Sequence, residues 1–262
     1  MSLKLFDQNK DPVCAKRYDF ILKEINEYTG HKSEKNVHIL DVGCGRGELA
    51  GFLAKFNYQI LGVDIYQPKI DEAKKLYPFG NVTFECQDAL NLDLKNKFDI
   101  IVASDVIEHL KKPEKFVVTA NSLLKPDGIF IITIPNGYGI KELTHRMYKR
   151  YVLNTFLHRF FRYIRRRLIG DDEWAVPEVD TLSAVKFPHV QFFSFKQLNK
   201  LLKNGGFYVK GQRNGSFISS IYMLRALFDS ILILKKLDIL FADALPHFLA
   251  SSWFIVAKKK NI

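Results

Sequence analysis

Apolar residues along this chain follow two alternating kinds of spacing. Short runs of consecutive apolar residues alternate with stretches in which apolar residues recur every three or four positions. The runs are typical of buried strands, and the stretches are typical of amphipathic helices. Their alternation predicts an α/β fold with a parallel sheet covered by helices on both faces. We expect strands at 37–43, 58–65, 81–89, 98–105, 129–136 and 251–260, helices at 13–29, 47–56, 67–77 and 113–124, and a turn at 125–128.

One further helix is predicted from its end signals. Ser194 and Gln197 have the spacing of a capping box, and Gly205 and Gly206 follow as a stop. With 262 residues, of which 47% are hydrophobic, the chain can form one large core. We therefore interpret 1–262 as a single domain with three additions. These are an N-terminal helical cap at 1–35, a basic helical insertion or lid at 139–186, and an apolar helical segment at 213–249 before the last strand.

The sequence DVGCGRGEL at 41–49 lies between the first strand and the helix after it. Its glycines, Gly43, Gly45 and Gly47, allow the backbone to turn tightly or to approach a ligand closely. A strand-to-helix turn at the carboxyl edge of a doubly wound sheet is a common ligand site, because the helix N-terminus presents unpaired N–H groups. Tight packing alone is the alternative explanation for the three glycines.

Acidic residues are predicted at the ends of the next two strands. Asp64 follows the glycine loop by about 20 residues, where a carboxylate can accept hydrogen bonds from a ribose diol. Asp88 ends the third predicted strand, where an acid can accept from an adenine amino group. Each aspartate alone could instead be a helix cap or a turn residue. Taken together, the groups at successive strand ends predict a nucleotide-like ligand.

In this order along the chain, these motifs resemble the class I S-adenosylmethionine-dependent methyltransferases. The similarity is to the broad group that contains the ubiquinone-biosynthesis O-methyltransferases and their small-molecule relatives. It implies a Rossmann-like sheet of seven strands whose last strand is antiparallel. The residues that carry it are ILDVGCGRGELA, GVDI, QDA and FDIIVASDVIEHL, with HVQFFSFKQLNKLLKNGGF and LPHFLASSWFIVAKK further on.

The resemblance also implies a role for each cofactor-binding residue. Asp41 and the three loop glycines would hold the methionine part of S-adenosylmethionine, and Asp64 would hold the ribose hydroxyls. Ile65, Asp88 and Ala89 would surround the adenine, and Ser104 and Asp105 would lie beside the sulfonium. A nicotinamide-dependent dehydrogenase is the alternative, but its G-x-G-x-x-G fingerprint differs from the G-x-G-x-G of this loop.

Two histidines are candidates for a catalytic base. His109 follows the fourth strand, and His189 precedes the return of the chain to the core. A histidine titrates near working pH and could accept the proton of an acceptor hydroxyl. Alternatively, His109 could brace the short segment after its strand, and His189 could be a packing residue. We see no ligand cluster that predicts a metal site.

The segment 141–170 is strongly basic, with nine lysines and arginines and one glutamate. Its apolar residues fall mostly four apart, which predicts a basic amphipathic helix or helix pair. It could be a lid over the active site, with the acidic stretch 171–180 folded back onto it. It could also contact an anionic membrane surface and suit a lipid-linked acceptor. Binding to nucleic acid is the third possibility.

The remaining composition bears on location and partners. The net charge of +11 indicates a negatively charged partner or surface. The three cysteines have no metal or disulfide spacing, and the first residues resemble no signal peptide. We therefore expect free thiols, buried or half-buried, and a cytoplasmic protein, either fully in the cytoplasm or peripheral at the inner face of the membrane. The predicted activity is methyl transfer, to oxygen of a small-molecule or lipid-linked metabolite. The alternatives are a methyltransferase of RNA or other nucleic acid and a non-catalytic cofactor-binding module. The sequence leaves the oligomeric state open.

Overall fold

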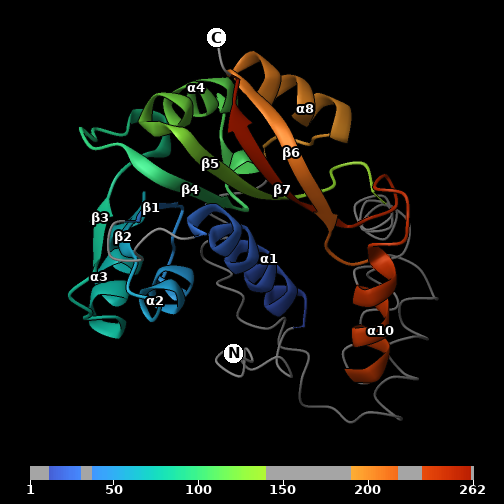
Figure 1. The fold of residues 1–262 in the computed structure, drawn as a ribbon, viewed down its shortest axis with the longest axis horizontal. Helices are drawn as coiled ribbons and strands as arrows, with labels where there is room; N and C mark the ends of the chain where they lie inside the picture. Colours follow the sequence, from blue (N-terminus) through green and yellow to red (C-terminus); the bar gives the residue numbers. More distant parts are fainter. Residues whose placement is uncertain (1–11, 31–36, 140–189, 218–231, 261–262) are drawn as a thin grey trace, which may run out of the picture.

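A computed structural model describes residues 12–30, 37–139, 190–217 and 232–260 of the chain (Figure 1). Its centre is a seven-stranded sheet in the order β3-β2-β1-β4-β5-β7-β6. The strands are β1 His38–Val42, β2 Gln59–Asp64, β3 Val82–Cys86, β4 Phe98–Ser104, β5 Leu124–Pro135, β6 Phe207–Asn214 and β7 Ser252–Lys259. The helices are α1 Pro12–Thr29, α2 Glu48–Ala54, α3 Gln67–Leu76, α4 Pro113–Leu123, α8 Phe195–Asn204 and α10 Leu232–Ala242, and the short 3₁₀ turns are η2 Ala89–Asn91 and η3 Ile107–His109.

The direction of the strands brings several strand ends to one edge of the sheet. β1 to β5 pair in parallel, whereas β7 runs antiparallel to both β5 and β6. The start of β7 therefore lies beside the end of β5, with Ser252 paired to Pro135. The predicted seven-stranded α/β sheet with an antiparallel last strand is confirmed.

Two apolar cores cover the two faces of the sheet. On one face, side chains from α1, α2 and α3 pack on alternate strand residues, such as Ile39, Ile100 and Ile131. On the other face, α4 and α8 pack on the intervening residues, such as Leu40 and Ile132. The continuous apolar runs in the sequence are thus explained for β1, β4, β5 and β7, because these strands bury both of their faces, whereas the edge strands β3 and β6 have exposed positions.

Helix α1 lies across the first face of the sheet, between α10 and the start of β4 (Figure 1). The ring of Phe20 lies 5.8 Å from that of Phe254 in β7. The Tyr28 hydroxyl donates to Asp99 at the start of β4, at 3.0 Å. The Lys16 ammonium donates to the carbonyl of Ile239 in α10, at 2.9 Å. These contacts fix α1 along its length. The position of Arg17, which follows Lys16, is therefore fixed as well.

Helix α8 begins and ends at the predicted signals. The Ser194 hydroxyl accepts from the Gln197 N–H, and the Gln197 side chain accepts from the Ser194 N–H. Gly206, just past the helix, has a φ of 84°, which a glycine adopts without strain. The predicted capping box and stop are confirmed.

Some predicted boundaries were wrong. Residues 125–128 belong to β5 and are not a separate turn, and the pairing with β4 shifts register at Phe98. β3 ends at Cys86, so Asp88 lies two residues beyond the strand. The Cys86 thiol is exposed, unlike those of Cys14 and Cys44, and none of the three forms a disulfide within the described residues.

The predicted subdivisions of the domain are described only in part. Within 1–35 the structure describes α1, and within 213–249 it describes the end of β6 and α10. The basic insertion at 139–186 lies outside the described residues, except for Gly139. No helix in the described ranges is both long and apolar enough to span a membrane.

Candidate cofactor and active site

The three loop glycines all adopt the left-handed backbone region, but for different structural reasons. Their φ angles are 70° at Gly43, 55° at Gly45 and 79° at Gly47. A Cβ on Gly43 would lie 2.5 Å from a methyl of Val106, and a Cβ on Gly47 would lie 2.7 Å from the ring of Phe84. A Cβ on Gly45 would meet no atom within 4 Å. Packing therefore explains the outer two glycines, whereas Gly45 borders open space in which a ligand can approach the backbone.

The Asp64 carboxylate joins the glycine loop to the end of β2. One oxygen accepts from the Gly45 N–H and the other from the Tyr66 N–H, both at 2.9 Å. A carboxylate has about four acceptor positions, so two remain for another donor. Asp64 therefore has both a structural role in the loop and the capacity to bind a diol.

Asp41 is a buried carboxyl group next to this loop. It lies in β1 and is 2% exposed. Its Oδ2 atom has no hydrogen-bond partner among the residues that the structure describes. Burial, and secondarily the charge of Asp64, raises the pKa of Asp41 to about 7. A buried acceptor without a donor is costly, and a ligand with a donor group could satisfy it.

The residues predicted around the adenine lie beyond β2 and β3. Ile65 follows β2 directly, and its side chain is exposed. Asp88 caps the η2 turn: its oxygens accept from the Leu90 N–H and from the Asn91 side chain, both at 2.9 Å. The turn role that was the alternative for Asp88 is therefore present. Ala89 is the first residue of that turn.

Ser104, the last residue of β4, and Asp105, which follows it, form a polar cluster with an arginine from α1. The Arg17 guanidinium lies 2.7 Å from an Asp105 oxygen and donates to the Ser104 hydroxyl at 3.2 Å. The hydroxyl of Thr133 in β5 lies 2.9 Å from that of Ser104 and donates to Asp105 at 3.2 Å. Asp105 itself has a φ of 55°, which is unusual for a residue with a side chain. These contacts hold the Asp105 carboxylate in one position.

Sequence reasoning missed Arg17 and Thr133. Burial disfavours the charge on Arg17, but Asp105, together with smaller contributions from Cys14 and Tyr18, outweighs this effect, and the pKa of Arg17 is raised. Its Nε atom is buried and has no partner among the described residues. Nothing in the spacing of the N-terminal helix indicates a site residue, because tertiary packing alone brings α1 to the end of β4. Thr133 had a weak signal as a polar residue within the apolar run IFIITIP.

The structure places one of the two candidate bases. His109 ends η3, directly after the β4 end, and is half-buried. His189 lies outside the described residues. The next residue, Val190, donates its N–H to the Glu108 carbonyl at 2.9 Å. The chain after His189 therefore returns beside His109.

The described residues suit a cofactor with a polar amino-acid end and a nucleoside. The open space at Gly45, the unsatisfied Asp41 oxygen and the exposed Ile65 all adjoin the glycine loop or the end of β2. Within these same ranges, no group of three or more histidine, cysteine, aspartate or glutamate side chains could hold a metal ion.

Comparison with known proteins identifies the family. A family model described as "Methyltransferase domain" matches residues 6–211, which is most of the chain. The chain belongs to this methyltransferase family. The predictions of a methyltransferase enzyme and of S-adenosylmethionine as its cofactor are confirmed at this level.

Curated proteins that are similar to this chain are also methyltransferases, but the similarity covers only part of each sequence. The ubiquinone biosynthesis O-methyltransferase of Coxiella burnetii (strain Dugway 5J108-111) is 37% identical over 109 residues, which are 40% of this chain and 46% of that protein. The chain thus matches about half of the length of this curated relative.

Two solved structures share the fold. An S-adenosylmethionine-dependent methyltransferase from Clostridium acetobutylicum has a TM-score of 0.57 and 16% identity, covering 94% of this chain and 92% of that chain. Magnesium protoporphyrin IX methyltransferase from Synechocystis PCC 6803, with bound SAH, has a TM-score of 0.54 and 15% identity, covering 99% and 90%.

Substitution of two loop glycines should separate folding from ligand binding. We expect Gly47→Ala to lower the free energy of unfolding by about 3 kcal/mol, because backbone strain adds to the overlap with Phe84. We expect Gly45→Ala to cost about 1 kcal/mol, from strain alone. Gly45→Ala should nevertheless weaken S-adenosylhomocysteine binding at least about tenfold, because its methyl group enters the ligand space. Urea denaturation and calorimetric titration measure the two effects, and wild-type affinity in Gly45→Ala would contradict the assignment.

The stability of the cofactor-free protein should depend on pH through Asp41. Its pKa is about 7 in the folded state and near the ordinary 3.8 in the unfolded state, so the folded state binds more protons between these values. Stability contributed by this carboxyl is fully present below pH 4 and is lost as the pH rises towards 7. Asp41→Asn should lack this loss, so its free energy of unfolding relative to wild type should rise from pH 4 to 7. A difference that does not change with pH would contradict the raised pKa.

Proposed function

We propose that the chain transfers the methyl group of S-adenosylmethionine to an oxygen of a small-molecule or lipid-linked acceptor. The observation that carries this proposal is the meeting of the open Gly45 loop, the Asp64 carboxylate and the Ser104–Asp105 cluster at one edge of the sheet. The choice of oxygen is supported by the relative from Coxiella burnetii, which is a ubiquinone biosynthesis O-methyltransferase.

In this proposal the cofactor lies across the carboxyl ends of β1, β2 and β4. Its methionine part lies against Gly45, with Gly43 and Gly47 shaping the loop and the amino group as the donor that Asp41 lacks. Its ribose hydroxyls occupy the two remaining acceptor positions of Asp64. The exposed side chain of Ile65 then packs on the adenine, with Asp88 and Ala89 at the amino edge.

The sulfonium end of the cofactor would lie beside Ser104 and Asp105. Arg17, from α1, forms an ion pair with Asp105 that balances much of its charge and borders this end of the proposed site. A covered site keeps water away from the activated methyl group. The protein then has to hold an acceptor oxygen in line behind the methyl carbon, and positioning of this kind contributes up to roughly 7–11 kcal/mol in favourable cases.

The transfer itself needs one proton acceptor. The acceptor oxygen forms a bond to the methyl carbon while the carbon–sulfur bond breaks and its electron pair stays on sulfur. The hydroxyl proton passes to a base, which leaves a methyl ether and S-adenosylhomocysteine. His109 is the candidate within the described residues, and His189 is the second candidate because the chain just after it contacts the Glu108 carbonyl.

A lipid-linked acceptor is favoured by the composition of the chain. The net charge of +11 and the nine basic residues in 141–170 suit a protein that works at an anionic membrane surface. We therefore propose cytoplasmic, peripheral association with the inner face of a membrane. A nucleic-acid acceptor is the competing possibility, and binding to RNA that falls steeply with added salt would favour it.

Substitution of the candidate base should affect turnover and leave cofactor binding intact. We expect His109→Gln to lower kcat for a catechol acceptor by about 10²-fold or more, because the hydroxyl proton loses its acceptor. The affinity for S-adenosylhomocysteine should stay within about twofold of wild type. His38→Gln, at the opposite edge of the sheet, is the matched control and should retain wild-type turnover. Product is measured as the methyl ether by mass spectrometry, and unchanged turnover in His109→Gln would assign the base elsewhere.

A further inference from the structure

Helix α10 has large apolar side chains on the face that points away from the protein. Leu240 is 71% exposed and Phe241 is 64% exposed, and Leu237 lies one turn earlier on the same side. Phe248, after the helix, is 62% exposed. The spacing i, i+3, i+4 puts the three helical residues on one face. We call Leu237, Leu240, Phe241 and Phe248 the apolar stripe.

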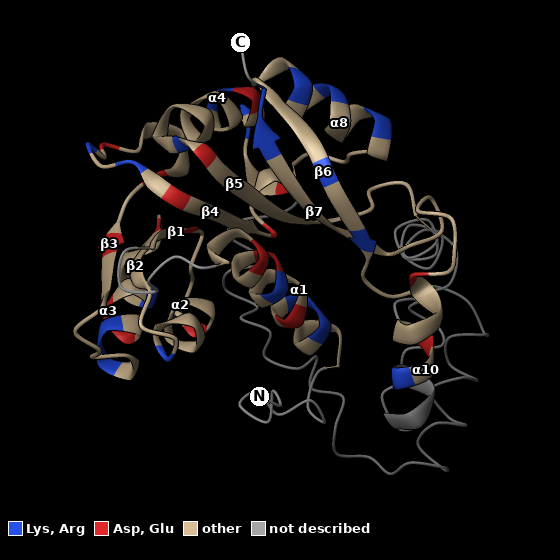
Figure 2. Cartoon of the chain, viewed as in Figure 1, with Lys and Arg blue, Asp and Glu red and all other residues tan. Residues whose placement is uncertain are grey.

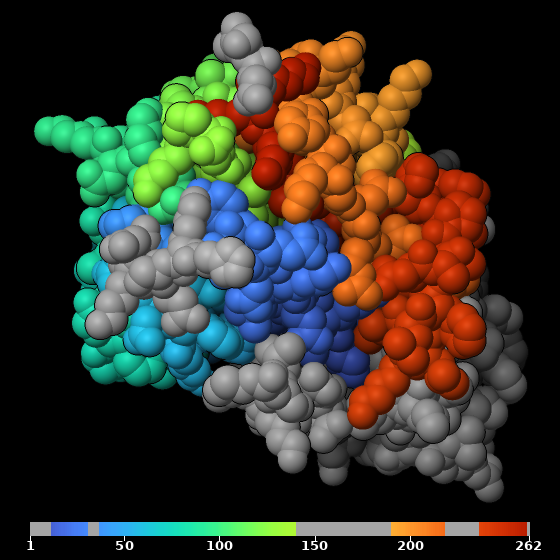
Figure 3. Space-filling model, in the orientation of Figure 1, coloured from blue at the N-terminus to red at the C-terminus, as the bar shows by residue number. Residues whose placement is uncertain are grey.

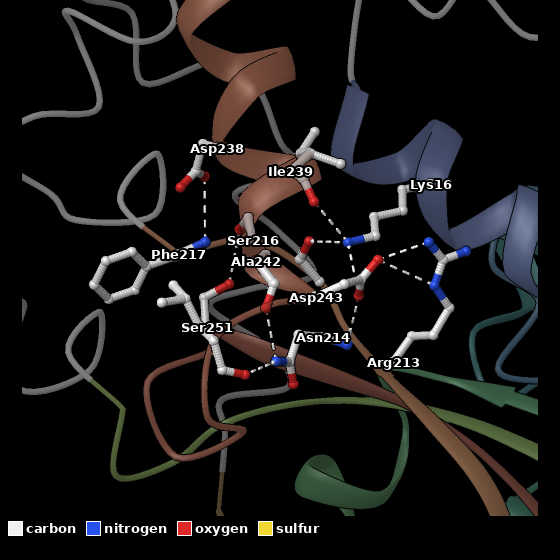
Figure 4. A network of polar contacts seen from close by, with 12 residues as sticks. Lys16, Arg213, Asn214, Ser216, Phe217, Asp238, Ile239, Ala242, Asp243 and Ser251 are labelled. Carbon is white, nitrogen blue, oxygen red and sulfur yellow. Dashed lines mark hydrogen bonds and ion pairs between the residues drawn. The ribbon is translucent and has the colours of Figure 1, made fainter.

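The opposite face of α10 is fixed by polar contacts to α1 and β6 (Figure 4). The Lys16 ammonium lies 3.1 Å from an Asp243 oxygen, and the Arg213 guanidinium lies 2.6 Å from the other. The Asn214 side chain donates to the Ala242 carbonyl at 2.8 Å, and Asp238 accepts from the Phe217 N–H at 3.2 Å. Helix α10 is therefore held in one orientation, and the stripe faces outward because of these contacts.

The exposure of several large apolar side chains on one face of α10 is unusual for a helix at a protein surface. A surface helix normally keeps its apolar residues on the inward side, whereas α10 is apolar on both sides: Ile239 and Ala242 are buried beside Asp238, and the stripe is exposed. Figure 3 shows α10 at the molecular surface beside β6, and Figure 2 shows that the described part of α10 carries both basic and acidic residues. Contiguous exposed apolar residues of this kind mark an interaction site.

We propose that the apolar stripe of α10 docks onto the surface of an anionic lipid bilayer. Leu237, Leu240, Phe241 and Phe248 enter the interface between head groups and acyl chains, and the exposed Lys236 beside them meets anionic head groups. The net charge of +11 supports this choice. A second copy of the chain is disfavoured because a symmetric contact would bring two strongly basic molecules together through the same surface.

The apolar stripe lies at a position that suits the proposed function. The choice of a lipid surface as its partner rests on that proposed function. The Asn136 side chain, just after β5, donates to the carbonyls of Phe248 and Ala250, at 3.0 and 2.8 Å. The start of β7 lies beside the end of β5, so Phe248 lies at the same edge of the sheet as Ser104 and Asp105. A bilayer that contacts Phe248 would therefore lie near the edge at which a lipid-linked acceptor has to reach the methyl group.

Vesicle sedimentation of the full chain tests this inference. Wild type should sediment with vesicles of phosphatidylglycerol and phosphatidylcholine at low salt, and much less with phosphatidylcholine alone. Leu240→Asp/Phe241→Asp should reduce vesicle affinity at least about tenfold, because two carboxylates resist transfer into the interface. The matched control is Leu76→Asp/Val118→Asp, which adds the same charge at side chains that are 52% and 56% exposed on α3 and α4, and it should bind as wild type does.

Further measurements separate the possible outcomes. Phe248→Ser, which adds no charge, should also weaken vesicle binding, and S-adenosylhomocysteine titration shows whether each variant is folded. The inference is overturned if wild type does not sediment, if the stripe variants bind as wild type does, or if the control loses as much affinity. It is also overturned if sedimentation velocity shows a dimer that only the stripe variants dissociate. Methylation of a soluble catechol reports on the proposed function separately, because it needs no bilayer.

Discussion

The hydrogen bond from the Gly45 N–H to the Asp64 carboxylate is the contact on which the geometry of the site depends. It connects the loop after β1 to the end of β2 and holds the loop in the left-handed backbone conformation that only glycines adopt without strain. Packing at Gly43 and Gly47 fixes the loop on either side, so Gly45 can stay open to a ligand. The same carboxylate keeps free acceptor positions, so the residue that shapes the loop is also the one proposed to bind the ribose.

The direction of the strands then determines which side chains meet. Parallel pairing of β1, β2 and β4 brings Asp41, Asp64 and Asp105 to one edge, although they are far apart in the sequence. Antiparallel pairing of β7 adds the segment before β7 to that edge, and Lys16 fixes α1 so that Arg17 reaches Asp105. The candidate cofactor site, the candidate base and the apolar stripe therefore lie at the same edge of the sheet.

Much of the fold could be predicted from the sequence, because its signals are local. Continuous apolar runs, the glycine loop and the Ser194 capping box each reflect a constraint within a few residues. The boundary of β5 was wrong, since residues 125–128 extend the strand through a register shift that no turn signal reveals. The contact between Arg17 and Asp105 could not be predicted, because it depends on how α1 packs across the sheet. The role of Asp88 as the cap of η2 was open in the sequence, and the structure shows that this role is present.

Calorimetric titration of S-adenosylmethionine and S-adenosylhomocysteine into wild type and Asp64→Ala tests the cofactor site most directly. Wild type should bind both, and Asp64→Ala should bind at least about 100-fold more weakly, because two hydrogen bonds to a charged group are lost. Asp71→Ala, which removes a carboxylate from the surface of α3, should bind as wild type does. Equal affinity in wild type and Asp64→Ala would contradict the placement of the ribose at the end of β2, and with it the site described at this edge.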